Sequence, residues 1–176
     1  ILLKMESVIQ NSAEKLKKID AEIEKQIRKE IKSDDSDLEV VPDGIVDVDE
    51  YLKAKFKILW ILKEPYDDID NNGKPFGGGW HLRQVILERQ NFDEYKGGRR
   101  TFEPMVYTTW GILNDFCQWI DMKDVRDDSK MLNVLKEIAY INVKKLPGYT
   151  SSPQPVIEYA YEQHHEILHK QITEYD

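Results

Sequence analysis

Two apolar segments of the sequence carry polar side chains that could do chemistry. Glu64 follows the run 57–62, and Asn142 lies within the run 138–143. An apolar run without alternation is typical of a strand buried on both faces of a parallel sheet. Ligands of such sheets bind at the carboxyl ends of the strands, where a carboxylate can act as a general base beside an amide that donates and accepts hydrogen bonds. The alternative, that Glu64 caps a loop and Asn142 completes a turn, fits the spacing equally well.

The residues around these two positions resemble the motifs of the uracil-DNA glycosylase superfamily. The segment Lys-Glu-Pro-Tyr at 63–66 is similar to the first motif of that family, in which a buried strand ends in an acidic residue followed by Pro and Tyr. Asn142, followed by an aliphatic residue, two lysines and then Pro147, is similar to the strand that reads the base. Phe76 stands close to where the family places an aromatic. The resemblance covers about residues 40–173.

The resemblance implies a DNA glycosylase that hydrolyses the N-glycosidic bond of uracil, or of another modified base, flipped out of DNA. It implies neither a cofactor nor a metal. Glu64 would orient or activate the attacking water and stabilise the oxocarbenium-like sugar. Asn142 would read the carbonyl and ring N–H of the base, and Phe76 would stack on the base. Pro65 and Tyr66 would complete the substrate pocket, with Tyr66 as a wall.

The sequence departs from the family pattern at two places. Leu62 or Lys63 replaces the Gly that is usual near the start of the first motif, so a base other than uracil is compatible with it. The chain stops at Asp176, after the helix that should lead into a later strand and a His-bearing loop. We expect the sequence to be incomplete there, because an unfinished parallel sheet leaves an exposed edge. The identity of the base and the strandedness of the DNA stay open.

The charge of the chain argues against a protein that coats nucleic acid in general. Acidic residues outnumber basic ones by 33 to 25, for a net charge of −8. The basic residues expected to contact DNA phosphates locally are Lys74, Arg99, Arg100, Lys144 and Lys145. An ordinary solvated surface explains these residues equally well. The glycines 77–79 could present N–H groups to a phosphate, but a flexible loop followed by a capping or surface His81 is the simpler interpretation.

Two other functions are compatible with the sequence. His165, Glu166 and His169 match His-Glu-x-x-His on an expected helix, the spacing at which zinc hydrolases hold a metal and a general base. A surface histidine cluster is the simpler interpretation, because the residues that follow offer a poor third ligand. The acidic charge and the missing last motif also suggest a glycosylase-fold module that binds nucleic acid or protein without catalysis.

The elements that position these residues follow from the periodicity. Apolar residues at helical spacing predict one long helix over 5–33, whose stripe favours packing across a domain over a coiled-coil seam, although self-association through it is compatible. Further helices are expected over 48–55, 80–87, 131–137 and 156–173, and a loop over 66–80. The aromatics of one further helix, Tyr107, Trp110, Phe116 and Trp119, are expected in the core. A second loop is expected at 97–100.

Strands alternating with helices predict an α/β fold, a three-layer α/β/α arrangement around a small parallel sheet. We expect an N-terminal helical extension over 1–38 and the glycosylase-like domain over 39–176, without its C-terminal strand and last motif. With 40% hydrophobic and 33% charged residues, the 176-residue chain is typical of one globular domain, not of a fibre or a membrane protein. A single cysteine, Cys117, excludes an intrachain disulfide, so a cytoplasmic protein is expected.

Overall fold

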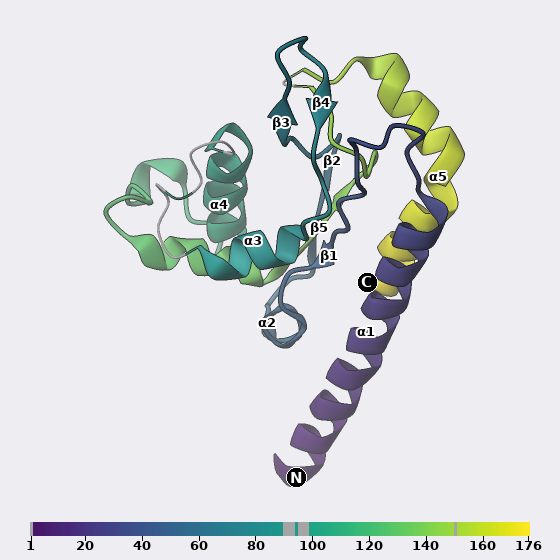
Figure 1. The fold of residues 1–176 in the computed structure, drawn as a ribbon. Helices are drawn as coiled ribbons and strands as arrows, with labels where there is room; N and C mark the ends of the chain where they lie inside the picture. The colour runs from purple at the N-terminus through teal and green to yellow at the C-terminus, as the bar shows by residue number, and fades with distance from the viewer. Residues whose placement is uncertain (1, 90–93, 95–98, 150) are drawn as a thin grey trace.

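The computed structural model describes residues 2–89, 94, 99–149 and 151–176, with side chains from residue 10 onward (Figure 1). The α-helices are α1 (Leu2–Glu30), α2 (Val48–Lys53), α3 (Leu82–Glu88), α4 (Arg99–Leu113) and α5 (Gln154–Glu174), and the 3-10 helices are η2 (Trp119–Asp121) and η3 (Ser129–Lys136). The strands are β1 (Gly44–Ile45), β2 (Ile58–Leu62), β3 (Asp68–Ile69), β4 (Pro75–Phe76) and β5 (Ile138–Asn142). The chain is therefore a mixed helix and strand protein.

The central sheet is mixed, with the strand order β1-β5-β2. β2 and β5 run parallel, from Ile58 opposite Ile138 to Leu62 opposite Asn142. β1 runs antiparallel to β5, which corrects the expected all-parallel sheet. A strand of two residues after a turn has no periodicity that the sequence could reveal. Burial on both faces holds for β5, whose five residues are all buried, whereas the edge strand β2 is only partly buried.

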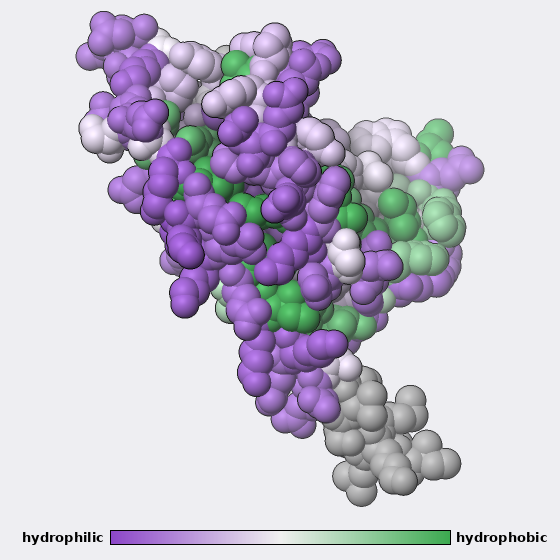
Figure 2. Space-filling model, turned by 90° about the vertical axis from the view of Figure 1, so that its right-hand side faces the viewer, coloured by the Kyte–Doolittle hydropathy of each residue, from purple (hydrophilic) through white to green (hydrophobic). Residues whose placement is uncertain are grey.

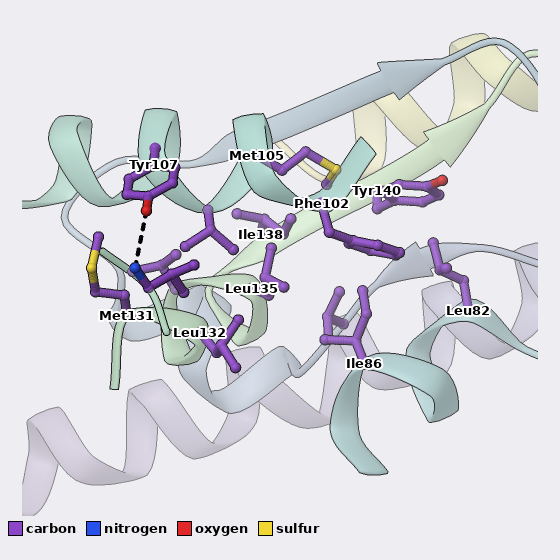
Figure 3. Packing of buried hydrophobic residues seen from close by; sticks show 14 residues of the cluster. Leu82, Ile86, Phe102, Met105, Tyr107, Met131, Leu132, Leu135, Ile138 and Tyr140 are labelled. Carbon is purple, nitrogen blue, oxygen red and sulfur yellow. Dashed lines mark hydrogen bonds between the residues drawn. The ribbon is translucent and has the colours of Figure 1, made fainter. Parts of the chain in front are cut away.

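Alternate residues of β5 enter two separate hydrophobic clusters. Ile138 and Tyr140 pack with side chains from α3, α4 and η3 in the cluster drawn in Figure 3. Ala139 and Ile141 pack on the other face with side chains from α1, α2 and α5. Full burial of an isoleucine or valine contributes about 1.5–3 kcal/mol, so covering both faces of β5 is a large share of the stability.

The helix α1 packs on the second cluster through its apolar stripe. Ala13, Ile23 and Ile27 are all buried there, together with Ile31, which directly follows the helix. This confirms the expected packing, and α1 shares a core with residues beyond 38. Figure 1 shows α1 beside α5, and Figure 2 shows a largely hydrophilic surface on that side of the molecule. The buried part of this stripe is occupied within the chain. Self-association through residues 5–33 stays a prediction.

Polar side chains also tie α1 to the rest of the molecule. The carboxylate of Asp20, 3% exposed, accepts hydrogen bonds from the Ile45 N–H at 3.4 Å and the Tyr175 hydroxyl at 2.7 Å, and it forms an ion pair with Arg83. One turn later, the Glu24 carboxylate lies 3.1 Å from His81 Nε2. The anchored α1 thus fixes the start of α3 and the end of α5.

His81 has the capping role that the sequence suggested. It is the N-cap of α3, and its Nδ1 accepts the Arg83 N–H at 3.0 Å. The proton of the neutral ring therefore lies on Nε2, where it is donated to Glu24. Burial lowers the pKa of His81 and Arg83 lowers it further, while Glu24 opposes both effects.

The region between β2 and the end of α4 departs from the expected elements. The expected loop 66–80 contains the β3–β4 hairpin. Arg99 and Arg100 begin α4 instead of lying in a loop, and the other two residues of that expected loop, 97 and 98, lie outside the described residues. Phe116 and Trp119 are each 66% exposed instead of buried. The left-handed backbone at Asp115 and Phe116 ends the helical repeat, so these side chains leave the buried face.

Within the described part of the chain, each helix is too short or too polar to cross a lipid bilayer. The tertiary structure is held together by the two hydrophobic clusters around β5 and by the polar contacts of α1.

The cap at His81 predicts a pH dependence of stability. Because its pKa is lowered on folding, the unfolded chain binds more protons below about 6.5, the ordinary value, and the free energy of unfolding falls as the pH falls through that window. His81→Asn keeps a capping side chain and removes the titration, so its melting temperature should decline less between pH 7 and pH 5. Circular-dichroism melts at several pH values measure this. Equal declines in both proteins would contradict the assignment.

Candidate functional site

The segments that follow β2 and β5 continue side by side beyond the sheet. The Val143 N–H donates to the Leu62 carbonyl at 2.8 Å, and the Lys144 N–H donates to the Lys63 carbonyl at 2.9 Å. Further on, Tyr66 and Gly148 form a parallel bridge. Paired backbones therefore hold the two sequence motifs together at the carboxyl end of the sheet.

Glu64 is buried at this end, with its side chain 2% exposed. Its Oε2 accepts a hydrogen bond from Lys144 Nζ at 2.7 Å, and the same ammonium donates to the Pro147 carbonyl at 3.0 Å. Its Oε1 is buried without a hydrogen-bond partner among the described residues. The carboxylate is therefore held by an ammonium and keeps one oxygen free, unlike a loop cap that bonds to backbone N–H groups.

Gly148 makes room for this carboxylate. A Cβ at position 148 would lie 1.8 Å from Glu64 Oε2, so any side chain there would displace the carboxylate. In a parallel bridge the paired residues project to the same face. The Glu64 carboxylate thus lies on the face to which the Tyr66 side chain projects.

Asn142 ends β5 opposite Leu62, two residues before Glu64, and is 1% exposed. Neither its Oδ1 nor its Nδ2 has a hydrogen-bond partner among the described residues. The Tyr140 hydroxyl, two residues earlier on the same face, approaches the amide without the geometry of a hydrogen bond. Burial raises the pKa of Tyr140, with a smaller contribution from Asp43, so Tyr140 is a neutral phenol.

The unpartnered atoms of the described core belong to two residues at the carboxyl ends of the paired strands β2 and β5. The three buried side-chain atoms without a hydrogen bond are Glu64 Oε1, Asn142 Oδ1 and Asn142 Nδ2. Each unsatisfied buried polar atom costs about 1–3 kcal/mol, so proteins rarely keep several of them together without a ligand that completes them. The set offers two acceptors and one donor to a ligand.

A buried ion pair fixes the backbone of Asn142. Asp43 Oδ2 accepts the Asn142 N–H at 2.7 Å, and both oxygens of Asp43 bind Lys145 Nζ, at 2.6 and 2.9 Å. Gln171 of α5 accepts from the same ammonium at 2.9 Å. Burial lowers the pKa of Lys145, and Asp43 opposes that shift. The expected phosphate contact of Lys145 does not fit this position, because its ammonium is buried and bound within the chain.

The other expected substrate contacts, Pro65, Tyr66 and Phe76, lie in the segments that follow Glu64. Pro65 is buried, Tyr66 is 48% exposed and Phe76 is 38% exposed. Phe76 lies opposite Asp68 in the β3–β4 hairpin, next to the bridge at Tyr66. Asp67 anchors this hairpin by accepting the Gly78 N–H and the Trp80 indole N–H, each at 2.7 Å.

Arg99 and Arg100, two of the residues expected to contact phosphates, lie at the start of α4. Thr109 accepts a hydrogen bond from Trp60 in the middle of β2, whereas Asp115 pairs with Lys55 before β2. α4 therefore runs antiparallel to β2, as Figure 3 shows for its residues beside β5. The exposed Arg99 and Arg100 thus lie toward the end of the sheet that carries Glu64.

Acidic partners hold several of the basic residues. Lys74 pairs with Asp35 at 2.6 Å, and Lys144 pairs with Glu64. Arg99 lies 4.0 Å from the Glu103 carboxylate. The positive charge that the sequence suggested near the site is thus largely balanced.

The glycines 77–79 are not a phosphate cradle. Their N–H groups donate to the Asp37 carbonyl, the Asp67 carboxylate and the Val40 carbonyl. The backbone at Gly78, with φ +95°, passes so close to the Glu39 carbonyl that a Cβ would lie 1.9 Å from it. These glycines therefore shape the return of the hairpin to the core.

The histidines of the His-Glu-x-x-His motif lie on an exposed face of α5. The rings of His165 and His169 are 5.8 Å apart, and Tyr161 packs against both. The Tyr161 hydroxyl lies 3.3 Å from His169 Nε2. No group of three or more candidate metal ligands occurs in the described part of the chain.

The sequence pointed to Glu64 and Asn142 but missed the residues that hold them. In the sequence, Gly148 follows Pro147 and Asp43 lies between Pro42 and Gly44, so both are typical turn residues and neither points to the site. Lys144 was expected to face DNA. No pattern in one sequence indicates that a turn residue lies opposite a strand end about a hundred residues away, as Asp43 lies opposite Asn142.

No protein-family model matches this chain, and neither the curated proteins nor the solved structures include a significant match.

The buried ion pair predicts a large effect on stability. Lys145→Met leaves the Asp43 carboxylate buried without its counter-charge, which should lower the free energy of unfolding by about 3–5 kcal/mol. Asp43→Asn in the same chain should recover part of that loss. Lys17→Met is the control, because its exposed pair with Asp49 is worth under about 1 kcal/mol. Urea unfolding measures all of these values, and equal losses for Lys145→Met and Lys17→Met would refute the role of the pair.

Proposed function

We propose that this chain belongs to a DNA N-glycosylase of the uracil-DNA glycosylase type, with the three-layer α/β/α arrangement of that family, acting in the cytoplasm. It would hydrolyse the N-glycosidic bond of uracil or another modified base flipped out of DNA. The observation that carries the proposal is that Glu64 and Asn142, at the ends of two paired strands, both bury atoms without a hydrogen-bond partner. No cofactor enters the proposal.

The amide of Asn142 suits the edge of a nucleobase. Its Nδ2 donates to a carbonyl and its Oδ1 accepts a ring N–H, which is the pairing that a pyrimidine edge offers. A buried amide with fixed backbone also discriminates strongly, because a base with the wrong edge leaves its atoms unpaired. Asp43 supports this reading by holding the Asn142 N–H.

The carboxylate of Glu64 is suited to bind the water that attacks the sugar. Lys144 occupies Oε2, so Oε1 is the oxygen left to accept a hydrogen bond from the attacking water. A carboxylate next to the sugar also stabilises the positive charge that develops as the bond breaks. Phe76 would stack on the extruded base, Tyr66 would form a wall, and Pro65 would support the pocket between them. Phosphates would meet Arg99, Arg100, Lys74 and Lys144 at the rim.

Base release tests the proposal directly. The probe is an oligonucleotide that contains uracil, read as strand breaks after alkali treatment. Glu64→Gln should lower the rate of release by about 10²–10⁴-fold, because it removes the group that activates water. Asp68→Asn is the matched control, since this exposed carboxylate lies close by in the chain and should leave the rate unchanged.

The outcomes separate the enzyme from the binding module. No release of uracil would exclude that base, and no release from oligonucleotides with other modified bases would reject the enzyme. Binding without release, unchanged by Glu64→Gln, would establish the non-catalytic module instead.

A further inference from the structure

Three aromatic side chains with donor atoms gather on one exposed face of α5. The ring centroids of His165 and His169 are 5.8 Å apart, and the Tyr161 ring lies 5.9 Å from the first and 6.2 Å from the second. All three side chains are exposed, and the proposed function uses none of them. A metal ion could therefore reach both imidazoles from solvent.

The backbone of α5 explains why the two imidazoles meet. His164 has non-helical backbone angles, φ −131° and ψ 15°, and the helix continues after it. His165 and His169 are thus about one helical turn apart, and residues at this spacing project to the same face. Tyr161 precedes the kink and packs against both rings across it. The two imidazoles are therefore placed to bind one ion together.

Hydrogen bonds orient both rings. His165 Nδ1 lies 3.2 Å from the Glu162 carbonyl oxygen, which can only accept, so the proton of the neutral ring lies on Nδ1. The lone pair of His165 Nε2 is thereby left for a metal, and metal-binding histidines usually donate their other N–H to a carbonyl or carboxylate in this way. His169 Nε2 lies 3.3 Å from the Tyr161 hydroxyl, so the second ligand atom faces the cluster.

The charges and the donor atoms favour one class of ion. Glu162 and Glu166 are exposed near His165 in the helix, and the chain carries a net charge of −8, so the local field attracts cations. Lys170 does not compete, because its Nζ is turned toward α1 and donates to Gln26 at 3.1 Å. Two imidazole nitrogens, with water at the remaining positions, suit the tetragonal geometry of Cu²⁺ and Ni²⁺, whereas Mg²⁺ prefers oxygen ligands.

We infer that His165 and His169 form a binding site for a divalent late transition-metal ion, and that the bound ion stabilises the C-terminal part of α5. This inference does not rest on the proposed glycosylase activity. An ion held by residues one turn apart favours the helical conformation between them, so it binds the folded chain better than the unfolded chain. The same part of α5 carries Gln171, which binds the buried Lys145, so the ion would also support that contact.

Isothermal titration calorimetry of the untagged chain, treated with EDTA and then desalted, measures the affinity. The probes are Cu²⁺, Ni²⁺ and Mg²⁺ alone. One Ni²⁺ should bind per chain, Cu²⁺ should bind more tightly, and Mg²⁺ should not bind. His169→Asn should weaken Ni²⁺ binding at least about tenfold, since even the loss of a partner of a metal ligand costs about 10–100-fold.

The neighbouring histidine provides the matched control. His164 is half-buried and lies near the charges of Glu30 and Lys145, away from the exposed pair. His164→Asn should therefore leave the affinity for Ni²⁺ unchanged. His165→Asn and His169→Asn combined should bind no more weakly than either alone, because one substitution already breaks the chelate. Wild-type affinity in both single variants, or an equal loss in His164→Asn, would show that the pair is not the site.

Thermal unfolding distinguishes a folded site from ion binding to any exposed histidine. With Ni²⁺ at about 100 times its Kd, the melting temperature of the wild type should rise by about 5–10 °C, and that of His169→Asn should not rise. Mg²⁺ at the same concentration controls for ionic strength. An unchanged or lowered wild-type melting temperature overturns the inference, because the ion would then bind the unfolded chain equally well. A rise that both histidine variants retain places the ion elsewhere and overturns it too.

Discussion

The ion pair between Asp43 and Lys145 is the interaction on which the arrangement of the site depends. It joins the turn before β1, the segment after β5 and, through Gln171, the helix α5. Both side chains are fully buried, so removing them from water costs several kcal/mol per charge. Five hydrogen bonds offset this cost: two from Lys145 to Asp43, one from Lys145 to Gln171, one from Gln171 Nε2 to Asp43, and one from the Asn142 N–H. The end of β5 is thereby held from three directions.

A second ion pair beside it has a different character. Lys144 and Glu64 lie closer to the surface, and the lysine side chain remains 18% exposed. Successive residues of one segment thus face opposite ways: Lys144 holds the carboxylate that we assign to catalysis, and Lys145 holds the strand that we assign to base reading. Because the two lysines are adjacent, a shift of this segment would move both parts of the site together.

The sequence predicted the parts of this structure that repeat along the chain. The helical stripe of α1 and the apolar runs of β2 and β5 each extend over enough residues to show their period, and the polar residues at the strand ends follow from those runs. The short strands β1, β3 and β4 have two residues each and no period to find. The partners of Glu64 and Asn142 depend on tertiary contacts: Lys145 looks like a surface lysine until Asp43 and Gln171 surround it. The predicted burial of Phe116 and Trp119 was wrong for a related reason. A left-handed backbone turn ends the helical spacing on which that prediction was based.

Gln171 and Tyr175 place the final turn of α5 in contact with both polar networks of the core. The Tyr175 backbone carbonyl also accepts the Tyr51 hydroxyl at 2.6 Å, which anchors α2. Proteolytic trimming of this helix back past Gln171 would therefore remove an acceptor of Lys145, a donor to Asp20 and the anchor of α2 at once. The loss of these few residues would thus loosen the end of β5 at a distance, without altering Glu64 or Asn142.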